Sequence, residues 1–151
     1  MKFFKLVLLF AVALAITSCS TMSNLDAIVR QATSEINSLD PHKEHGTFFY
    51  CSQGDCWYPE ILTGEAWSID LGPALITEHY PFLVGSIHSH PKSTEHSPED
   101  NALLDAINIT PSPTDWGSGA AVSRDFAELP FTVYIIGPDD VVRAYPLPTF
   151  K

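Results

Sequence analysis

The chain has 151 residues, with 8 basic and 18 acidic side chains and a formal net charge of −10 at pH 7. A surface with this excess of negative charge repels nucleic acid phosphates, so the charge disfavours a nucleic acid partner. The length that remains after the N-terminal segment is sufficient for one hydrophobic core of modest size, so we expect one domain.

The N-terminal segment has the order of an export signal. Lys2 and Lys5 precede an apolar run over residues 6–16, which is followed by the small and polar residues Thr17 and Ser18. The apolar run is too short for a membrane-spanning helix, which needs about 20 apolar residues. We therefore expect residues 1–18 to be a signal peptide, whose removal leaves 133 residues and, without its two lysines, a charge of −12.

The end of this segment, Ile16-Thr17-Ser18-Cys19, resembles a bacterial lipobox. The resemblance implies that Cys19 becomes the lipid-modified (palmitate-bearing) first residue of the mature protein and that residues 19–24 form a lipidated tether. The expected location is the cell envelope, with the protein held on a membrane; in a Gram-negative cell it would be the outer membrane, facing the periplasm or the surface. The alternative is an ordinary secretory signal with a chance cysteine near its end.

The mature chain begins with a predicted helix over residues 25–39. Apolar residues recur there at helical spacing: Leu25, Ile28, Val29, Ala32, Ile36 and Leu39. Asp40-Pro41 is expected to end the helix.

A hairpin with two cysteines is predicted next. Residues 46–51 and 56–62 are rich in aromatic side chains and flank the polar turn Ser-Gln-Gly-Asp. In an oxidising envelope compartment, Cys51 and Cys56 on the two arms can form a disulfide. The alternative is a pair of zinc thiolates, but two further ligands at matching spacing are missing.

The rest of the chain predicts a mixed α/β domain, in which a curved mixed sheet is flanked by helices. Its expected elements are a short strand at 67–71, a buried strand at 81–88, a helix at 97–107 with Leu103, Leu104 and Ile107 on one face, a loop at 110–119, and strands at 131–136 and 141–145 around a turn.

The candidate chemistry lies where the strand at 81–88 ends. His88 and His90, in the run His-Ser-His-Pro, are two residues apart, so on an extended chain both imidazoles point to the same side and can bind one metal ion. Ser97 and Pro98 are typical of a helix start and place Asp100 in the first turn. Two histidines, one carboxylate and an open position for water are the ligand set of a catalytic zinc ion.

These residues resemble the JAMM (MPN-type) zinc metalloprotease pattern, in which His-x-His-Pro precedes Ser-x-x-Asp. Lys43-Glu44-His45-Gly46 before a strand resembles the early glutamate of that family and of uncharacterised JAMM-like domains in bacterial toxins. The resemblance implies a JAMM-like fold over residues 25–151. It implies that His88, His90 and Asp100 bind Zn²⁺, that Glu44 is the general acid/base and that Ser97 helps to hold the oxyanion.

Other assignments stay open at this point. Five residues separate Pro91 from Ser97, one fewer than the family usually has, and Ser-Pro-x-Asp alone is an ordinary helix start. Several residues could therefore take over a predicted role: Glu95, His96 or Glu99 in place of Asp100, and Glu60, Glu65 or Glu78 in place of Glu44.

The function that these expectations describe is a zinc-dependent amide hydrolase of the cell envelope. Its substrate would be a peptide, an isopeptide or a peptidoglycan amide, and its membrane contact would be the N-terminal lipid. The alternative is a non-catalytic envelope lipoprotein that uses the same fold as a binding or assembly module. An exported toxin is less natural for a chain tethered by its own N-terminus.

Overall fold

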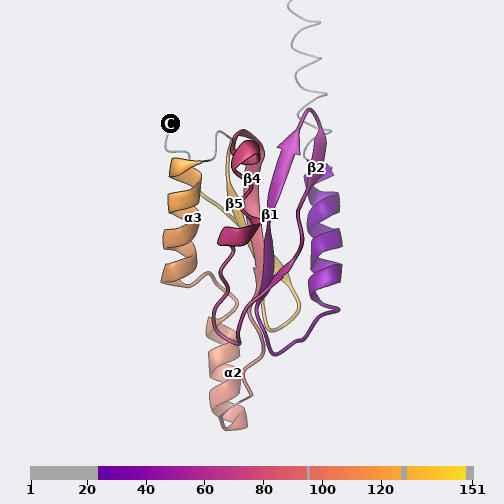
Figure 1. Ribbon diagram of the computed structural model, residues 1–151. Coiled ribbons are helices and arrows are strands. Elements are labelled where there is room, and N and C mark those ends of the chain that lie inside the picture. The colour runs from indigo at the N-terminus through magenta and orange to yellow at the C-terminus, as the bar shows by residue number, and fades with distance from the viewer. Residues whose placement is uncertain (1–23, 95, 127–128, 149–151) are drawn as a thin grey trace, which may run out of the picture.

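A six-stranded mixed sheet forms the centre of the computed structural model, which describes residues 24–94, 96–126 and 129–148 (Figure 1). Its strands are β1 (His45–Ser52), β2 (Asp55–Trp57), β3 (Leu62–Thr63), β4 (Leu83–Ser89), β5 (Thr132–Ile136) and β6 (Val142–Pro146). They are ordered β2-β1-β4-β5-β6, and β3 pairs with β1. Only β4 and β5 pair in parallel, which fits the long connection between them.

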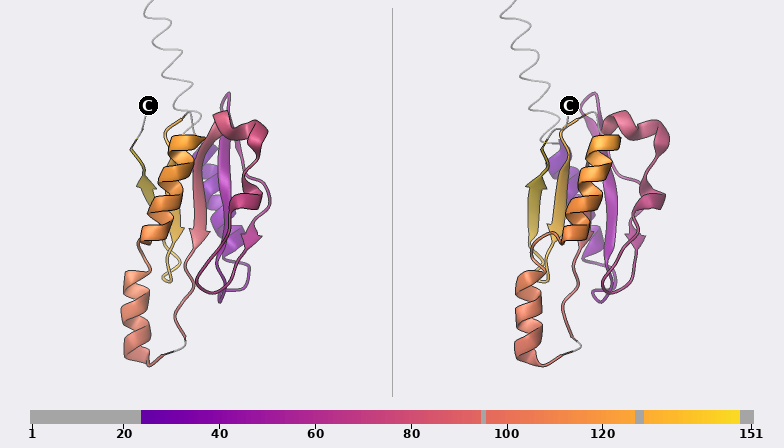
Figure 2. Two further views of the ribbon diagram at one scale, coloured as in Figure 1. Left: turned by 60° about the vertical axis from the view of Figure 1, so that its left-hand side comes forward. Right: turned by 90° about the vertical axis from the view of Figure 1, so that its left-hand side faces the viewer.

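The expected mixed α/β class is therefore confirmed. The expected curvature is not, because the sheet does not curl strongly (Figure 2). The strands expected at 81–88, 131–136 and 141–145 correspond to β4, β5 and β6. In place of one strand over 56–62, the chain forms the short strands β2 and β3, which pair with different ends of β1.

Helices cover both faces of the sheet (Figures 1 and 2). The helix over residues 24–36 covers one face, as its apolar spacing predicts, and packs there against a buried group: Val29, Ala32, Ile36, Phe49, Cys51, Val84, Ile87 and Ile136. On the opposite face, α3 (Pro113–Asp125) and the 3-10 helices η1 (Gly72–Ala74) and η2 (Thr77–Phe82) cover a second group: Phe48, Tyr50, Ala74, Leu83, Phe131, Val133, Ile135 and Leu147.

Helix α3 occupies the segment that was expected to be a loop, so that prediction is wrong. The small residues of this segment suggested a loop, but its first residues form a capping box that stabilises a helix start. The Ser112 side chain accepts from the backbone N–H of Asp115, and the Asp115 side chain accepts from the backbone N–H of Ser112. Pro113 is the first helical residue. A Cβ at Gly119 would lie 2.9 Å from Cγ2 of Val133, so this glycine lets the helix lie close to the sheet.

The short strand expected at 67–71 is also not formed. The segment makes one isolated bridge, between Glu65 and Ser68, and continues without strand pairing to η1. It lies instead along the side of the domain that faces α3, where it lines two pockets described below.

Helix α2 (Pro98–Ile107) forms where it was predicted but does not bury its apolar face. It projects beyond the end of the sheet (Figure 1), and Leu103 and Ile107 are 63% and 60% exposed. The helix holds the chain that follows β4 through a hydrogen bond, in which the Asp105 carboxylate accepts from the backbone N–H of Ser93.

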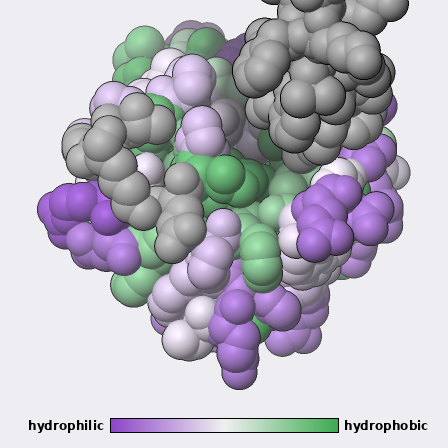
Figure 3. Space-filling model, turned by 90° about the horizontal axis from the view of Figure 1, so that it is seen from above, coloured by the Kyte–Doolittle hydropathy of each residue, from purple (hydrophilic) through white to green (hydrophobic). Residues whose placement is uncertain are grey.

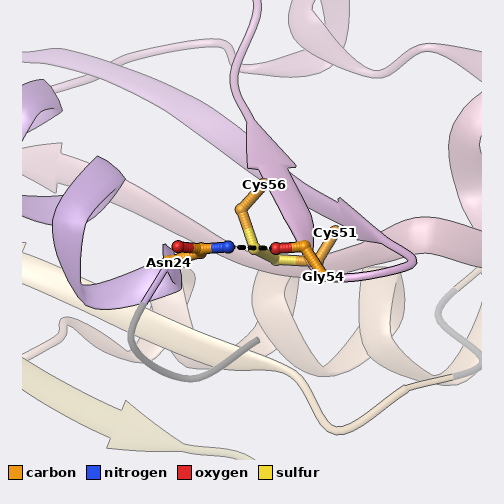
Figure 4. Close-up of a disulfide and its surroundings, with 4 residues drawn as sticks. All are labelled: Asn24, Cys51, Gly54 and Cys56. Carbon is orange, nitrogen blue, oxygen red and sulfur yellow. Dashed lines mark hydrogen bonds between the residues drawn. A yellow bond between two sulfur atoms is a disulfide. The ribbon is translucent and has the colours of Figure 1, made fainter. Parts of the chain in front are cut away.

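The predicted disulfide joins Cys51 of β1 to Cys56 of β2 (Figure 4). The two cysteines lie directly opposite each other in the antiparallel register. The Asn24 side chain donates to the carbonyl of Gly54 in the intervening turn, so the hairpin is also tied to the helix over 24–36.

Loss of this disulfide is expected to destabilise the fold modestly. For a loop of about six residues, the chain-entropy relation gives about 2 kcal/mol. Replacement of Cys51 and Cys56 by Ala should lower the free energy of unfolding by about that amount, measured by urea denaturation. Reductant should have the same effect on the wild type and none on the variant; a wild type that is insensitive to reductant would contradict the prediction.

No helix in residues 24–94, 96–126 and 129–148 is long and apolar enough to cross a membrane. The predicted signal peptide, Cys19 and most of the tether lie outside the described residues.

Figure 3 views the molecule from the end at which β4 begins, where apolar surface lies between more polar groups.

Candidate metal centre

Three side chains that can bind a metal ion converge at the end of β4. One ligand atom from each of His88, His90 and Asp115 lies within 4.8 Å of the other two. Nε2 of His88 is 3.1 Å from Nε2 of His90 and 3.2 Å from Oδ1 of Asp115. Nε2 of His90 is 3.5 Å from Oδ2 of Asp115. This group could hold a metal ion.

Strands β1 and β4 position His88. His88 is buried and lies opposite Gly46 in the antiparallel register. A Cβ at Gly46 would be 2.5 Å from the carbonyl oxygen of Ile87 and 2.9 Å from Cβ of His88. Glycine at this position therefore leaves the space that the His88 side chain occupies.

The end of α2 orients His90. Its Nδ1 lies 2.7 Å from the carbonyl oxygen of Asn108, the residue that follows α2. A carbonyl only accepts hydrogen bonds, so Nδ1 carries a proton and donates it. In neutral His90 this leaves the lone pair on Nε2, directed at His88 and Asp115. A hydrogen bond of this kind is typical of metal-binding histidines, because it fixes the tautomer and the direction of the ring.

The capping box of α3 orients Asp115. Oδ2 accepts from the backbone N–H of Ser112 at 2.6 Å, while the backbone N–H of Asp115 donates to the Ser112 hydroxyl. Oδ1 remains directed at His88. Helix capping and the candidate ligand role thus use the same carboxylate.

The charges of the three groups are coupled. Burial alone would lower the pKa of His90, but its hydrogen bonds to Asp115 and to the carbonyl of Asn108 raise that pKa above its usual value. Burial would raise the pKa of Asp115, but the hydrogen bonds from His88 and His90 hold it well below its usual range. The site therefore favours a positive charge between these atoms, carried by a proton or by a metal ion.

Glu44 lies beside this group, immediately before β1. It is only 8% exposed, and burial raises the pKa of its carboxyl group to about 7, although the charge of His90 opposes the rise. Glu44, His90, Ser112 and Asp115 all line a cavity of about 410 Å³, which we call the Glu44 cavity. The glutamate chosen from the sequence thus lies at the site.

Asp100 and Ser97 are not part of it. The Ser97 hydroxyl caps α2 and donates to Oδ2 of Asp100 at 2.8 Å, and both residues are exposed. The group that could hold a metal contains Asp115 and not Asp100. We therefore replace Asp100 by Asp115 as the candidate third ligand and Ser97 by Ser112 as the serine beside it.

The alternative residues lie elsewhere. Glu95 is outside the described residues, and His96 and Glu99 are exposed and do not belong to the three-residue group. The alternatives to Glu44 are exposed and do not line the Glu44 cavity: Glu60, Glu65 and Glu78.

The sequence did contain a signal for Asp115. The pattern Ser-Pro-x-Asp occurs twice, at residues 97–100 and at residues 112–115, and both copies start a helix. The prediction used the first copy, which follows His90 more closely along the chain, and did not consider the second. In the structure α2 extends beyond the sheet, and the second copy brings its aspartate back to the end of β4.

The burial of Glu44 predicts a pH-dependent stability in metal-free protein. A carboxyl group with a folded pKa of about 7 binds more protons in the folded than in the unfolded state between pH 4.5 and 7, so the free energy of unfolding falls as the pH rises through this window. Each pKa unit corresponds to about 1.4 kcal/mol. The free energy of unfolding of Glu44→Gln should therefore exceed that of the wild type by about 1–3 kcal/mol at pH 8 and should not exceed it at pH 4. Urea denaturation with a chelator present measures the difference; an equal difference at both pH values would contradict the prediction.

Comparisons of the chain with protein-family models, with curated proteins and with solved structures find no match.

Proposed function

We propose that this protein is a zinc-dependent amide hydrolase of the bacterial cell envelope, with a peptide, an isopeptide or a peptidoglycan amide as its substrate. The observation that carries the proposal is the convergence of two imidazoles and a carboxylate beside the buried glutamate Glu44. The His90 tautomer strengthens it. With Nδ1 donating to Asn108, Nε2 of neutral His90 and the carboxylate of Asp115 are both acceptors, and they repel each other unless a proton or a metal ion lies between them.

The donor set fits a catalytic zinc ion. Two histidine nitrogens and one carboxylate are three protein ligands, which leaves the fourth position of a tetrahedral ion open. A zinc ion would supply Lewis acidity, making water nucleophilic near neutral pH and polarising an amide carbonyl. The same donors also suit iron(II), but a glutamate that accepts protons near pH 7 favours hydrolysis.

Glu44 would move the proton in this reaction. A general base is most effective when its pKa lies near the working pH, and burial brings Glu44 to that range. It would take a proton from the attacking water and deliver it to the departing amine. The Ser112 hydroxyl, which lines the same cavity, is the candidate donor to the developing oxyanion.

The JAMM resemblance supports the proposal in a revised form. Its residues become His88-x-His90-Pro91 followed by Ser112-x-x-Asp115, with Glu44 upstream. The longer separation between the two parts contains α2, whose end holds His90. This resemblance and the proton-accepting glutamate together support amide hydrolysis as the proposed reaction.

The direction in which the site faces fits a tethered enzyme. Asn24 contacts the turn at Gly54, beyond the end of β1, whereas His88 pairs with Gly46 at the start of β1. These points are separated by the length of β1, about 25 Å for eight residues. A lipid at Cys19 would hold the first of these ends near the membrane, so the candidate centre would face the envelope space and the macromolecules in it.

The test is a hydrolysis screen of residues 20–151, exported without the lipid cysteine. Protein loaded with zinc should release amines from peptide amides, isopeptides or peptidoglycan fragments, and a chelator should stop the release until zinc is restored. Protein that binds zinc but hydrolyses none of these classes would contradict the hydrolase and favour the non-catalytic binding module.

A further inference from the structure

A second pocket adjoins the metal centre on the side of His88. It has a volume of about 210 Å³ and shares Ile69, Thr114 and Asp115 with the Glu44 cavity, while His88 lines only this pocket. We call it the Val133 pocket. Its walls come from β1, β4, β5, α3 and the chain over residues 69–75. Polar residues lie among them, but six apolar side chains also line the pocket: Phe48, Ile69, Leu71, Leu75, Val122 and Val133.

The volume of this pocket fits one side chain. A cavity of about 150 Å³ with apolar walls holds a benzene molecule, whereas pockets for drug-sized ligands start at about 300 Å³. The Val133 pocket lies between these sizes. It suits a leucine or phenylalanine side chain and is too small for a sugar residue with its substituents.

The chemistry of the lining disfavours a charged occupant. No Lys or Arg is among the residues that line the pocket, so a carboxylate side chain would find no permanently charged partner there. The acidic residues in the lining are Asp115, which faces the two histidines, and the exposed Asp70, whose Oδ1 accepts from the backbone N–H of Gly72.

We propose that the Val133 pocket binds one apolar side chain of the substrate, next to the amide bond placed at His88, His90 and Asp115. This inference rests on the proposed function and makes it narrower: the substrate is a peptide with a leucine-like or phenylalanine-like residue beside the cleaved bond. An acidic or glycine residue at that position is disfavoured. One or two methylene groups in such a pocket change the specificity about tenfold or more.

Binding can be tested without catalysis. In zinc-free His90→Ala protein, N-acetyl-leucine amide is titrated while the backbone amide signals of Gly119, Val122 and Val133 are followed by NMR. We expect saturable shifts of these signals with the leucine and phenylalanine amides and none with the glycine and glutamate amides. The pocket assignment is overturned if the four amides behave alike, or if none shifts these signals up to its solubility limit.

Two neighbouring substitutions on α3 form a matched pair. Ser118 is exposed and lines the pocket, so Ser118→Leu should fill it and weaken binding of the leucine amide about tenfold. Gly117 is exposed on the same helix turn, has open space around an added Cβ and does not line the pocket, so Gly117→Leu should leave binding unchanged. Equal weakening by both variants would overturn the assignment.

The outcomes separate this inference from the proposed function. If zinc-loaded protein cleaves leucine and glutamate peptides at equal rates, the protein is a hydrolase but the Val133 pocket does not select an apolar side chain. If the protein binds leucine amide at the Val133 pocket and never binds zinc, the pocket assignment is correct and the proposed zinc hydrolase is wrong. Leu75→Ala adds a check in active protein, because a larger pocket should shift the preference from leucine towards tryptophan.

Discussion

Asp115→Asn is expected to weaken zinc binding by more than about 100-fold. Asp115 contributes the only carboxylate in the three-residue group that could hold a metal, and replacement of residues that merely support a ligand already costs about 10–100-fold in affinity. The asparagine retains the size of the side chain, so the protein should remain folded. Competition with a zinc-binding dye at pH 7.5 measures the affinity.

Asp100→Asn is the matched control. Asp100 is also the last residue of a helix-starting Ser-Pro-x-Asp, but its carboxylate accepts from Ser97 at the exposed start of α2. Its replacement should cost at most about 1 kcal/mol of stability and leave zinc affinity unchanged. If Asp100→Asn loses zinc and Asp115→Asn does not, the assignment of the third ligand is wrong.

Glu44→Gln is expected to lower the rate of amide hydrolysis by about 10²–10⁴-fold while one zinc ion stays bound. A positioned general base contributes a factor of this size, and glutamine cannot accept the proton. Because Glu44 is not in the group that could hold the metal, zinc affinity should change little. The measurement is the turnover number on an amide substrate found by the screen, beside the zinc content of the same sample.

Glu65→Gln serves as the control for this substitution. Its backbone carbonyl accepts from the N–H of Glu44, so the two residues are neighbours, but the Glu65 side chain is exposed. We expect this variant to keep full activity. Full activity in Glu44→Gln, or an equal loss in Glu65→Gln, would remove Glu44 from the role of general base.

Local patterns in the sequence were sufficient for much of the fold. Periodicity and turn composition were sufficient to predict the helix over 24–36, the hairpin with its disulfide, and the buried strand β4. Helix α3 was missed because its glycines and serines have weak helix propensity. A capping box and close packing of Gly119 on Val133 override that propensity.

The candidate site was predictable in part for a similar reason. Two histidines that are two residues apart on an extended chain lie on the same side whatever the rest of the chain does, so His88 and His90 could be paired from the sequence. The third ligand depends on which helix returns to the end of β4, and that is set by packing between distant segments. Glu44 was chosen because it lies just before a predicted strand, but its burial beside Asp115 depends on contacts that no local pattern encodes.

The most direct test of the account is the metal content of the protein after zinc loading and dialysis, measured by elemental mass spectrometry on residues 20–151. The account predicts about one zinc ion per chain in the wild type and none in a folded His88→Ala, His90→Ala double variant. Folded wild-type protein without zinc, or equal zinc in wild type and double variant, would contradict a metal centre at His88, His90 and Asp115.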